Sequence, residues 1–271
     1  VPVRYHDFSE MKSYFSPDLW EFHLSYKDMD VEISSVFSER EDGDLVVHAP
    51  ELLKNSALLD ITSLDTGYRT FSIRQLQRVI DITRDLSKFF KIKKAPSIVV
   101  NVGGFSMDEP LTEPDVKYRY EILSESLSKL DSDGVLLLPQ TMAPFPWHFG
   151  GQRYQNLFVN LFDLLKYGTE LRLHYCFDVS HSFLHCNDKD QDFYVFTEKL
   201  MPFVKHLHIA DASGTNGEGL QIGEGEIDFE RLGKILRPYK DTVSFIPEIW
   251  QGHSDSGHGF RKALEALNGK L

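Results

Sequence analysis

Residues 204–211 read VKHLHIAD, a short apolar run that ends in polar side chains. An earlier segment, residues 171–178, reads LRLHYCFD and likewise ends in an acid, Asp178. Short apolar runs separated by amphipathic stretches are typical of parallel strands connected by helices. These two segments therefore predict neighbouring β/α units.

Further runs of this kind extend along the whole chain. The predicted strands cover residues 3–5, 19–24, 45–47, 97–102, 135–138, 171–177, 204–209 and 243–246. Helical patterns lie between them, most clearly over residues 72–90, opened by a capping-box arrangement of Ser72 and Gln75, and over residues 154–165. Because no linker rich in Pro, Gly or Ser divides the chain, we expect an α/β fold with a single (β/α)₈ TIM barrel domain over residues 1–271.

The composition of the chain bears on its partners, its location and its relation to membranes. The chain has 271 residues, a net charge of −12 and two cysteines. An acidic surface disfavours nucleic acid as a partner, and the cysteines form no disulfide framework or CxxC zinc pair, which favours a cytoplasmic location. The absence of a long apolar run predicts no membrane span.

Polar side chains follow the ends of several predicted strands. His48 ends the third strand, Gln140 the fifth, Asp178 the sixth and Glu248 the eighth, and His208 lies near the end of the seventh. The carboxyl ends of parallel barrel strands meet at one face, so these side chains can converge there. Carboxylate oxygens and imidazole together suit one divalent metal, namely Mn²⁺, Mg²⁺, Co²⁺ or Zn²⁺.

Each of these residue types also has a structural interpretation. A lone histidine in a strand is more often a hydrogen-bonded structural residue than a ligand, and His174 and His206 are interpreted in that way. Acids at strand ends often cap the next helix, and Asp211 is a candidate for capping a loop.

Several motifs together resemble the xylose-isomerase-like TIM barrel superfamily, which includes sugar isomerases, sugar epimerases, inositol-pathway dehydratases and an apurinic endonuclease. The resemblance spans the chain. The motifs are HLHIAD at 206–211, IGEGEIDF at 222–229, DVSH at 178–181, PE at 247–248 and HAP at 48–50.

This resemblance implies a metal site made of Gln140, Asp178, His208 and Glu248, in which Gln140 stands where the family has a glutamate. An amide oxygen carries no charge and cannot accept a proton, so we expect weaker metal binding and no two-carboxylate proton transfer between Gln140 and Glu248. Glu248 remains as a catalytic acid or base, and His181, with an ordinary pKa near neutrality, is a second candidate. One-base isomerisation or elimination stays open.

The substrate-binding candidates are His48, Lys27, Arg153 and Trp250. Lys27 would bind an anion and Trp250 would stack on a sugar ring, against the alternatives of a surface lysine and a packing aromatic. The expected ligand is a small-molecule carbohydrate.

A narrower resemblance concerns residues 3–8, 21–28 and 247–253, which are similar to barrel domains attached to sialic-acid-synthase-like proteins. It implies surface-polysaccharide biosynthesis and a linked or docked synthase domain.

Three hypotheses result. The first is a metal-dependent isomerase, epimerase or lyase acting on a sugar or sugar derivative. The second is a non-catalytic sugar-binding or regulatory barrel with a degenerate metal site, favoured by Gln140. The third, an endonuclease, is disfavoured by the acidic charge and by residues 101–104 (NVGG), which lack the histidine expected after strand four.

Overall fold

The structure is a computed structural model that describes residues 1–148 and 151–270. Its backbone divides into two compact units. The first contains Val1–Gly104 and Glu113–Pro139, and the second contains Phe105–Thr112 and Gln140–Leu271.

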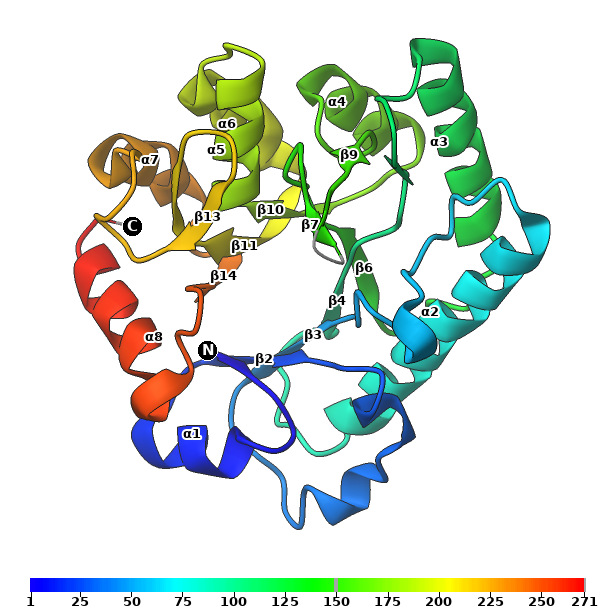
Figure 1. Cartoon of the computed structure of the whole chain (residues 1–271). Helices are drawn as coiled ribbons and strands as arrows, with labels where there is room; N and C mark the ends of the chain where they lie inside the picture. The colour runs from blue at the N-terminus through cyan, green and yellow to red at the C-terminus, as the bar shows by residue number, and fades with distance from the viewer. Residues whose placement is uncertain (149–150, 271) are drawn as a thin grey trace. The chain divides into compact units, whose positions relative to one another are not determined.

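The first unit is built on a five-stranded parallel sheet. Its strands, in spatial order, are β1 (Pro2–Val3), β2 (Leu19–His23), β3 (Asp44–His48), β4 (Ser97–Val100) and β6 (Leu136–Pro139). Three helices lie along one face of this sheet (Figure 1): α1 (Phe8–Tyr14), α2 (Thr66–Ser87) and α3 (Glu113–Leu127). Three 3₁₀ turns, η1 (Asp28–Asp30), η2 (Ile33–Ser35) and η3 (Lys54–Ser56), lie in the connections.

Aromatic packing holds α1 against this sheet. The ring of Phe8 lies 5.2 Å from the rings of both Phe22 and Phe37, and Phe22 lies 5.7 Å from Phe90. All four side chains are buried. Tilted and edge-on aromatic pairs at these separations add to the free energy gained from burial alone.

Helix α2 begins earlier than the sequence pattern predicts. Its cap is Asp65, whose Oδ1 accepts a hydrogen bond from the backbone N–H of Tyr68 at 2.9 Å. Ser72, the predicted cap, is buried inside the helix, and its Oγ accepts from the backbone N–H of Asp60. The predicted capping box is therefore wrong, because an equally good cap lies upstream.

The second unit is built on a three-stranded parallel sheet of β10 (Tyr175–Asp178), β11 (Val204–Ile209) and β14 (Ser244–Pro247). Its helices are α4 (Leu161–Glu170), α5 (Val179–Asp188), α6 (Phe193–Leu200), α7 (Phe229–Leu236) and α8 (Ser254–Leu267), coloured green to red in Figure 1. Two 3₁₀ turns, η4 (Met201–Phe203) and η5 (Arg237–Tyr239), precede β11 and β14.

Three short antiparallel pairs complete this unit. They are β12 (Asp211–Ser213) with β13 (Gly217–Leu220), β5 (Phe105–Ser106) with β9 (Tyr154–Gln155), and β7 (Trp147–His148) with β8 (Gly151–Gln152).

The helix expected over residues 154–165 is only partly present. Tyr154 and Gln155 pair instead with Ser106 and Phe105, and α4 begins at Leu161. Asn160 sets this start, because its Oδ1 accepts from the backbone N–H of Phe162 at 2.8 Å. The apolar residues of this segment recur at helical spacing throughout, so the sequence pattern does not show where the extended chain ends and the helix begins.

The eight predicted strand positions are confirmed, with bounds that differ by a few residues. Each is occupied by one of the eight parallel strands of the two sheets. Over residues 1–148 and 151–270, no helix is long and apolar enough to cross a membrane.

Candidate metal and acid–base site

Four side chains of the second unit meet at the carboxyl ends of its strands. Asp178 is the last residue of β10 and lies in register with His208 of β11. Glu248 follows β14 directly, and its backbone N–H donates to the carbonyl of Ile209. Gln140 joins them through a parallel bridge to Cys176. The parallel register therefore brings together residues far apart in the sequence.

Polar contacts connect these four side chains. Nδ1 of His208 lies 2.7 Å from Oε2 of Glu248 and 3.9 Å from Oδ2 of Asp178. Nε2 of Gln140 donates to Oδ2 of Asp178 at 2.9 Å and lies 3.1 Å from Nδ1 of His208. His208 and Asp178 are buried, whereas the side chain of Glu248 is 32% exposed. Glu248 is thus the member of the set most open to a ligand.

Asp178 has two roles that follow from its place between strand and helix. It is the N-cap of α5, where Oδ1 accepts from the backbone N–H of His181 at 2.8 Å, while Oδ2 faces Gln140. Burial raises the pKa of Asp178 to about 6, and the charge of Glu248 acts in the same direction, against the lowering effect of His181 and His208. Burial therefore disfavours the ionised form of Asp178, and a bound cation would stabilise that form.

His181 is surrounded by acceptors. Its Nδ1 lies 3.1 Å from the carbonyl oxygen of Thr141 and 3.4 Å from Oδ2 of Asp178, and its Nε2 lies 3.4 Å from Oε2 of Glu218. Burial lowers the pKa of this imidazole, but the carboxylates of Asp178, Glu218 and Glu248 outweigh burial and raise the pKa to about 10. His181 is therefore cationic at neutral pH, which differs from the near-neutral pKa expected from residue type alone.

The chemistry of these donors suits a divalent cation. Ligand atoms bound at about 2.0–2.2 Å to one metal lie about 3–4 Å from each other. The separations from His208 Nδ1, 2.7 Å to Glu248 and 3.9 Å to Asp178, are near this range. A half-turn of the Gln140 amide would present its oxygen in place of its nitrogen. Two carboxylates, one imidazole and one amide oxygen are hard or borderline ligands.

The side chain of Asp211 holds the backbone of a neighbouring loop, residues 223–227, in place. Both oxygens of this buried carboxylate accept backbone N–H groups: Oδ2 from Gly223 and Gly225 at 2.9 Å, and Oδ1 from Ile227 at 3.1 Å. A Cβ at Gly225 would overlap the Asp211 carboxylate, so the close approach requires glycine. Asp211 thus caps this loop, as proposed from the sequence.

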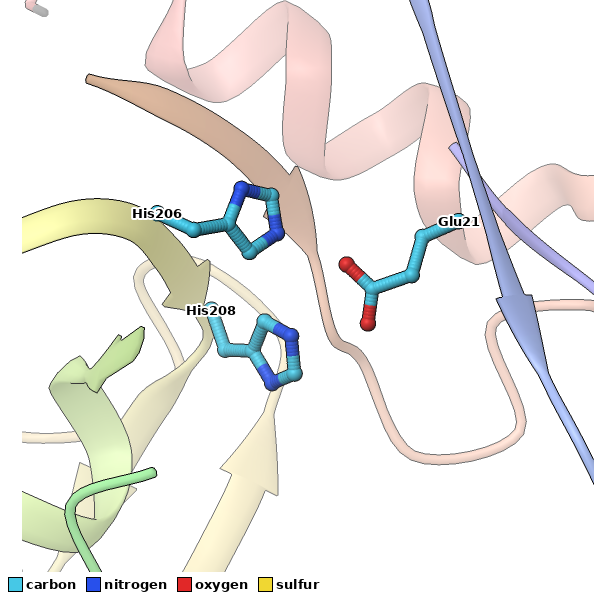
Figure 2. A group of neighbouring side chains, drawn as sticks. All are labelled: Glu21, His206 and His208. Carbon is cyan, nitrogen blue, oxygen red and sulfur yellow. The ribbon is translucent and has the colours of Figure 1, made fainter. Parts of the chain in front are cut away.

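His206 has the surroundings of a structural residue. It is buried, and its Nδ1 lies 2.8 Å from Oγ of Ser244. Figure 2 shows His206 and His208 projecting from the same side of β11, with ring centroids 5.4 Å apart. The third side chain in Figure 2, Glu21, belongs to β2 of the first unit.

Two of the predicted substrate-binding residues lie in the second unit and two in the first. The guanidinium of Arg153 lies over the ring of Phe105 at 5.5 Å, and Trp250 follows β14 with 76% of its surface exposed. In the first unit, Nδ1 of His48 lies 2.8 Å from the carbonyl oxygen of Ala49, and Nζ of Lys27 lies 6.0 Å from the ring centroid of Tyr26. Binding roles for all four stay predictions.

Sequence reasoning missed Glu218. It lies on β13, in the run GEGL, where two flanking glycines give no sign of a functional side chain. The β12–β13 hairpin brings it to His181. No periodicity signal could have found it.

Comparison with known proteins places the chain in a family. The family described as "Xylose isomerase-like TIM barrel" matches residues 9–270, so the chain belongs to this family. Its fold is accordingly the α/β TIM barrel expected from the eight strands. No curated protein sequence matches the chain.

Solved structures share this fold at low sequence identity. A D-tagatose 3-epimerase-like protein has 21% identity and a TM-score of 0.64, covering 99% of this chain and 98% of its own. A xylose isomerase domain protein from Planctomyces limnophilus has 12% identity and a TM-score of 0.67, covering 99% and 94%. A 3-keto-D-glucoside 4-epimerase from E. coli has 17% identity and a TM-score of 0.62, covering 97% and 92%.

Proposed function

We propose that this protein is a divalent-metal-dependent isomerase or epimerase that acts on a sugar or sugar derivative. The observation that carries the proposal is the approach of two carboxylates to His208: Glu248 Oε2 lies 2.7 Å and Asp178 Oδ2 lies 3.9 Å from its Nδ1. Similar solved structures include several sugar epimerases, which agrees with this reaction class.

In this proposal, Asp178, His208, Glu248 and the Gln140 amide oxygen hold one Mn²⁺, Mg²⁺, Co²⁺ or Zn²⁺ ion. When bound, the ion would polarise a carbonyl group of the substrate and stabilise the negative charge that develops on its oxygen. Glu248 is the proton acceptor, because its carboxylate is partly exposed and so can contact the substrate. His181 contributes a partly buried positive charge that stabilises an anionic intermediate.

The exposed indole of Trp250 lies two residues after Glu248 and provides an apolar surface for the sugar ring. His48, Lys27 and Arg153 are further contacts of the substrate in this proposal. The resemblance to barrel domains of sialic-acid-synthase-like proteins supports a role in surface-polysaccharide synthesis, together with a linked or docked synthase domain. The cysteine usage supports a cytoplasmic location.

A test of this function uses proton exchange. The Mn²⁺-loaded protein is incubated in D₂O with D-fructose, D-psicose and D-tagatose in turn, and deuterium at the carbon beside the carbonyl is followed by NMR. Incorporation that disappears in Glu248→Gln would support the proposal. No incorporation into any ketose by metal-loaded protein would oppose it.

A non-catalytic sugar-binding barrel is the second candidate. It is favoured by Gln140, whose amide hydrogen-bonds to Asp178 and so provides a neutral partner where a ligand charge is expected. It predicts sugar binding without proton exchange.

A further inference from the structure

Inversion at a carbon beside a carbonyl needs one group that removes a proton from one face and another that returns a proton to the opposite face. Glu248 supplies the first group, and the neutral Gln140 cannot supply the second. We propose that Glu218 of β13, paired with His181, is this second proton-transferring carboxylate. The inference rests on the proposed function and specifies its reaction as epimerisation.

Glu218 and Glu248 occupy the two ends of one continuous chain of polar contacts. Their side chains are 30% and 32% exposed, whereas those of His208 and Asp178 are only 0% and 3% exposed. The chain runs from Glu248 through His208, Gln140, Asp178 and His181 to Glu218. His181 is 17% exposed, so the two most exposed side chains of this chain of contacts are both carboxylates.

Backbone hydrogen bonds attach the segment that carries Glu218 to the segment that carries Glu248. Gly219, next to Glu218, accepts a hydrogen bond at its carbonyl from the backbone N–H of Trp250 at 2.8 Å, and Trp250 is two residues beyond Glu248. The N–H of Gly219 donates to Oγ of Ser180 at 3.1 Å. Gly219 has a φ of +69°, which glycine adopts without strain. The hairpin is therefore attached both to the Glu248 segment and to α5.

The proton transfers balance without an oxidant or co-reactant. Glu248 takes the proton from the carbon beside the carbonyl, the C–H bond breaks, and its electron pair moves into an enediolate. Glu218 then gives a proton to the other face of that carbon and takes a replacement proton from Nε2 of cationic His181. A new C–H bond forms, the carbonyl re-forms, and His181 is left neutral. The opposite epimer reacts in the reverse direction, with Glu218 as acceptor and Glu248 as donor.

A simple structural role for Glu218 makes a different prediction. If its only task is to accept a hydrogen bond from His181, the amide oxygen of glutamine can replace it. Glu218→Gln keeps this hydrogen bond but removes proton transfer. The variant therefore separates the two roles.

The experiment compares Glu218→Gln with the matched control Glu224→Gln, an exposed acid of a nearby loop that pairs with Lys262. Mn²⁺-loaded proteins react with D-psicose or D-fructose in D₂O, and NMR follows inversion and deuterium uptake separately. We expect Glu218→Gln to lose inversion by about 10²-fold or more. Exchange without inversion continues on one epimer, through Glu248. Glu224→Gln should match the wild type.

Two results would overturn the inference: inversion at the wild-type rate in Glu218→Gln, or loss of both inversion and exchange while metal content and melting temperature stay unchanged. If Glu218→Gln does not fold, Glu218→Asp replaces it, and inversion must persist at a reduced rate. The absence of exchange by the wild-type protein on every ketose would instead reject the proposed function itself.

Discussion

Nε2 of Gln140 donates a hydrogen bond to Oδ2 of Asp178 at 2.9 Å. An amide in this position stabilises a buried carboxylate when no metal is present. A glutamate would repel the carboxylate in the same state. On the proposed function, Gln140 therefore lowers the affinity for the cation and stabilises the metal-free site.

Gln140→Glu tests this exchange. We expect the Kd for Mn²⁺ to fall about tenfold or more, because the ligand set gains one negative charge. The metal-free variant should lose about 1–2 kcal/mol in its free energy of unfolding through like-charge repulsion. Calorimetric titration and urea unfolding measure the two effects. Gln251→Glu, which adds the same charge at an exposed position, is the control, and equal effects in both variants would refute the account.

Asp178→Asn separates the charge of Asp178 from its capping role, since asparagine caps helices equally well. Burial raises the pKa of Asp178 from 3.8 to about 6. A raised carboxyl pKa contributes stability at low pH that is lost as pH rises from about 4 to about 6. In the metal-free state, the unfolding free energy of the wild type minus that of the variant should therefore decrease over this interval. Urea unfolding at several pH values measures this difference, and a difference that is constant with pH would contradict the assignment.

We expect His185 to give the free energy of unfolding the opposite pH dependence. It is buried in α5, and neither ring nitrogen has a hydrogen-bond partner among the described residues. Burial, helped by Lys189, lowers its pKa from 6.5 to about 4. The unfolded chain takes up this proton first, so stability falls as pH decreases from about 6.5 to about 4, by up to about 3 kcal/mol.

His185→Leu should remove that decrease while His258→Gln, at an exposed site of α8, retains it. Thermal unfolding between pH 4 and pH 7 provides the comparison. An unchanged pH dependence in His185→Leu would show that another group is responsible.

We expect the loss of the Asp211 carboxylate to destabilise the loop that it holds. Asp211→Ala leaves the backbone N–H groups of Gly223, Gly225 and Ile227 without their acceptor, which should cost about 2–4 kcal/mol. Hydrogen exchange at these three amides should accelerate, whereas Glu224→Ala should leave it unchanged. Protection that survives in Asp211→Ala would show that other groups hold the loop.

The sequence predicted the strands and strand-end residues because both depend on local patterns. Apolar runs define each strand, and the parallel register then places Asp178, His208 and Glu248 at one edge. Contacts that depend on a loop's path were not predictable. Glu218 reaches His181 only through the β12–β13 hairpin, and three nearby carboxylates raise the pKa of His181 far above the value for its residue type.

Metal content tests the central claim most directly. Wild-type protein and Asp178→Asn are loaded with Mn²⁺, freed of excess ion by gel filtration and measured by inductively coupled plasma mass spectrometry. The account predicts about one Mn²⁺ per chain in the wild type and almost none in the variant, with similar circular dichroism spectra. A wild type without metal, or equal metal in both proteins, would contradict the site at Asp178, His208 and Glu248.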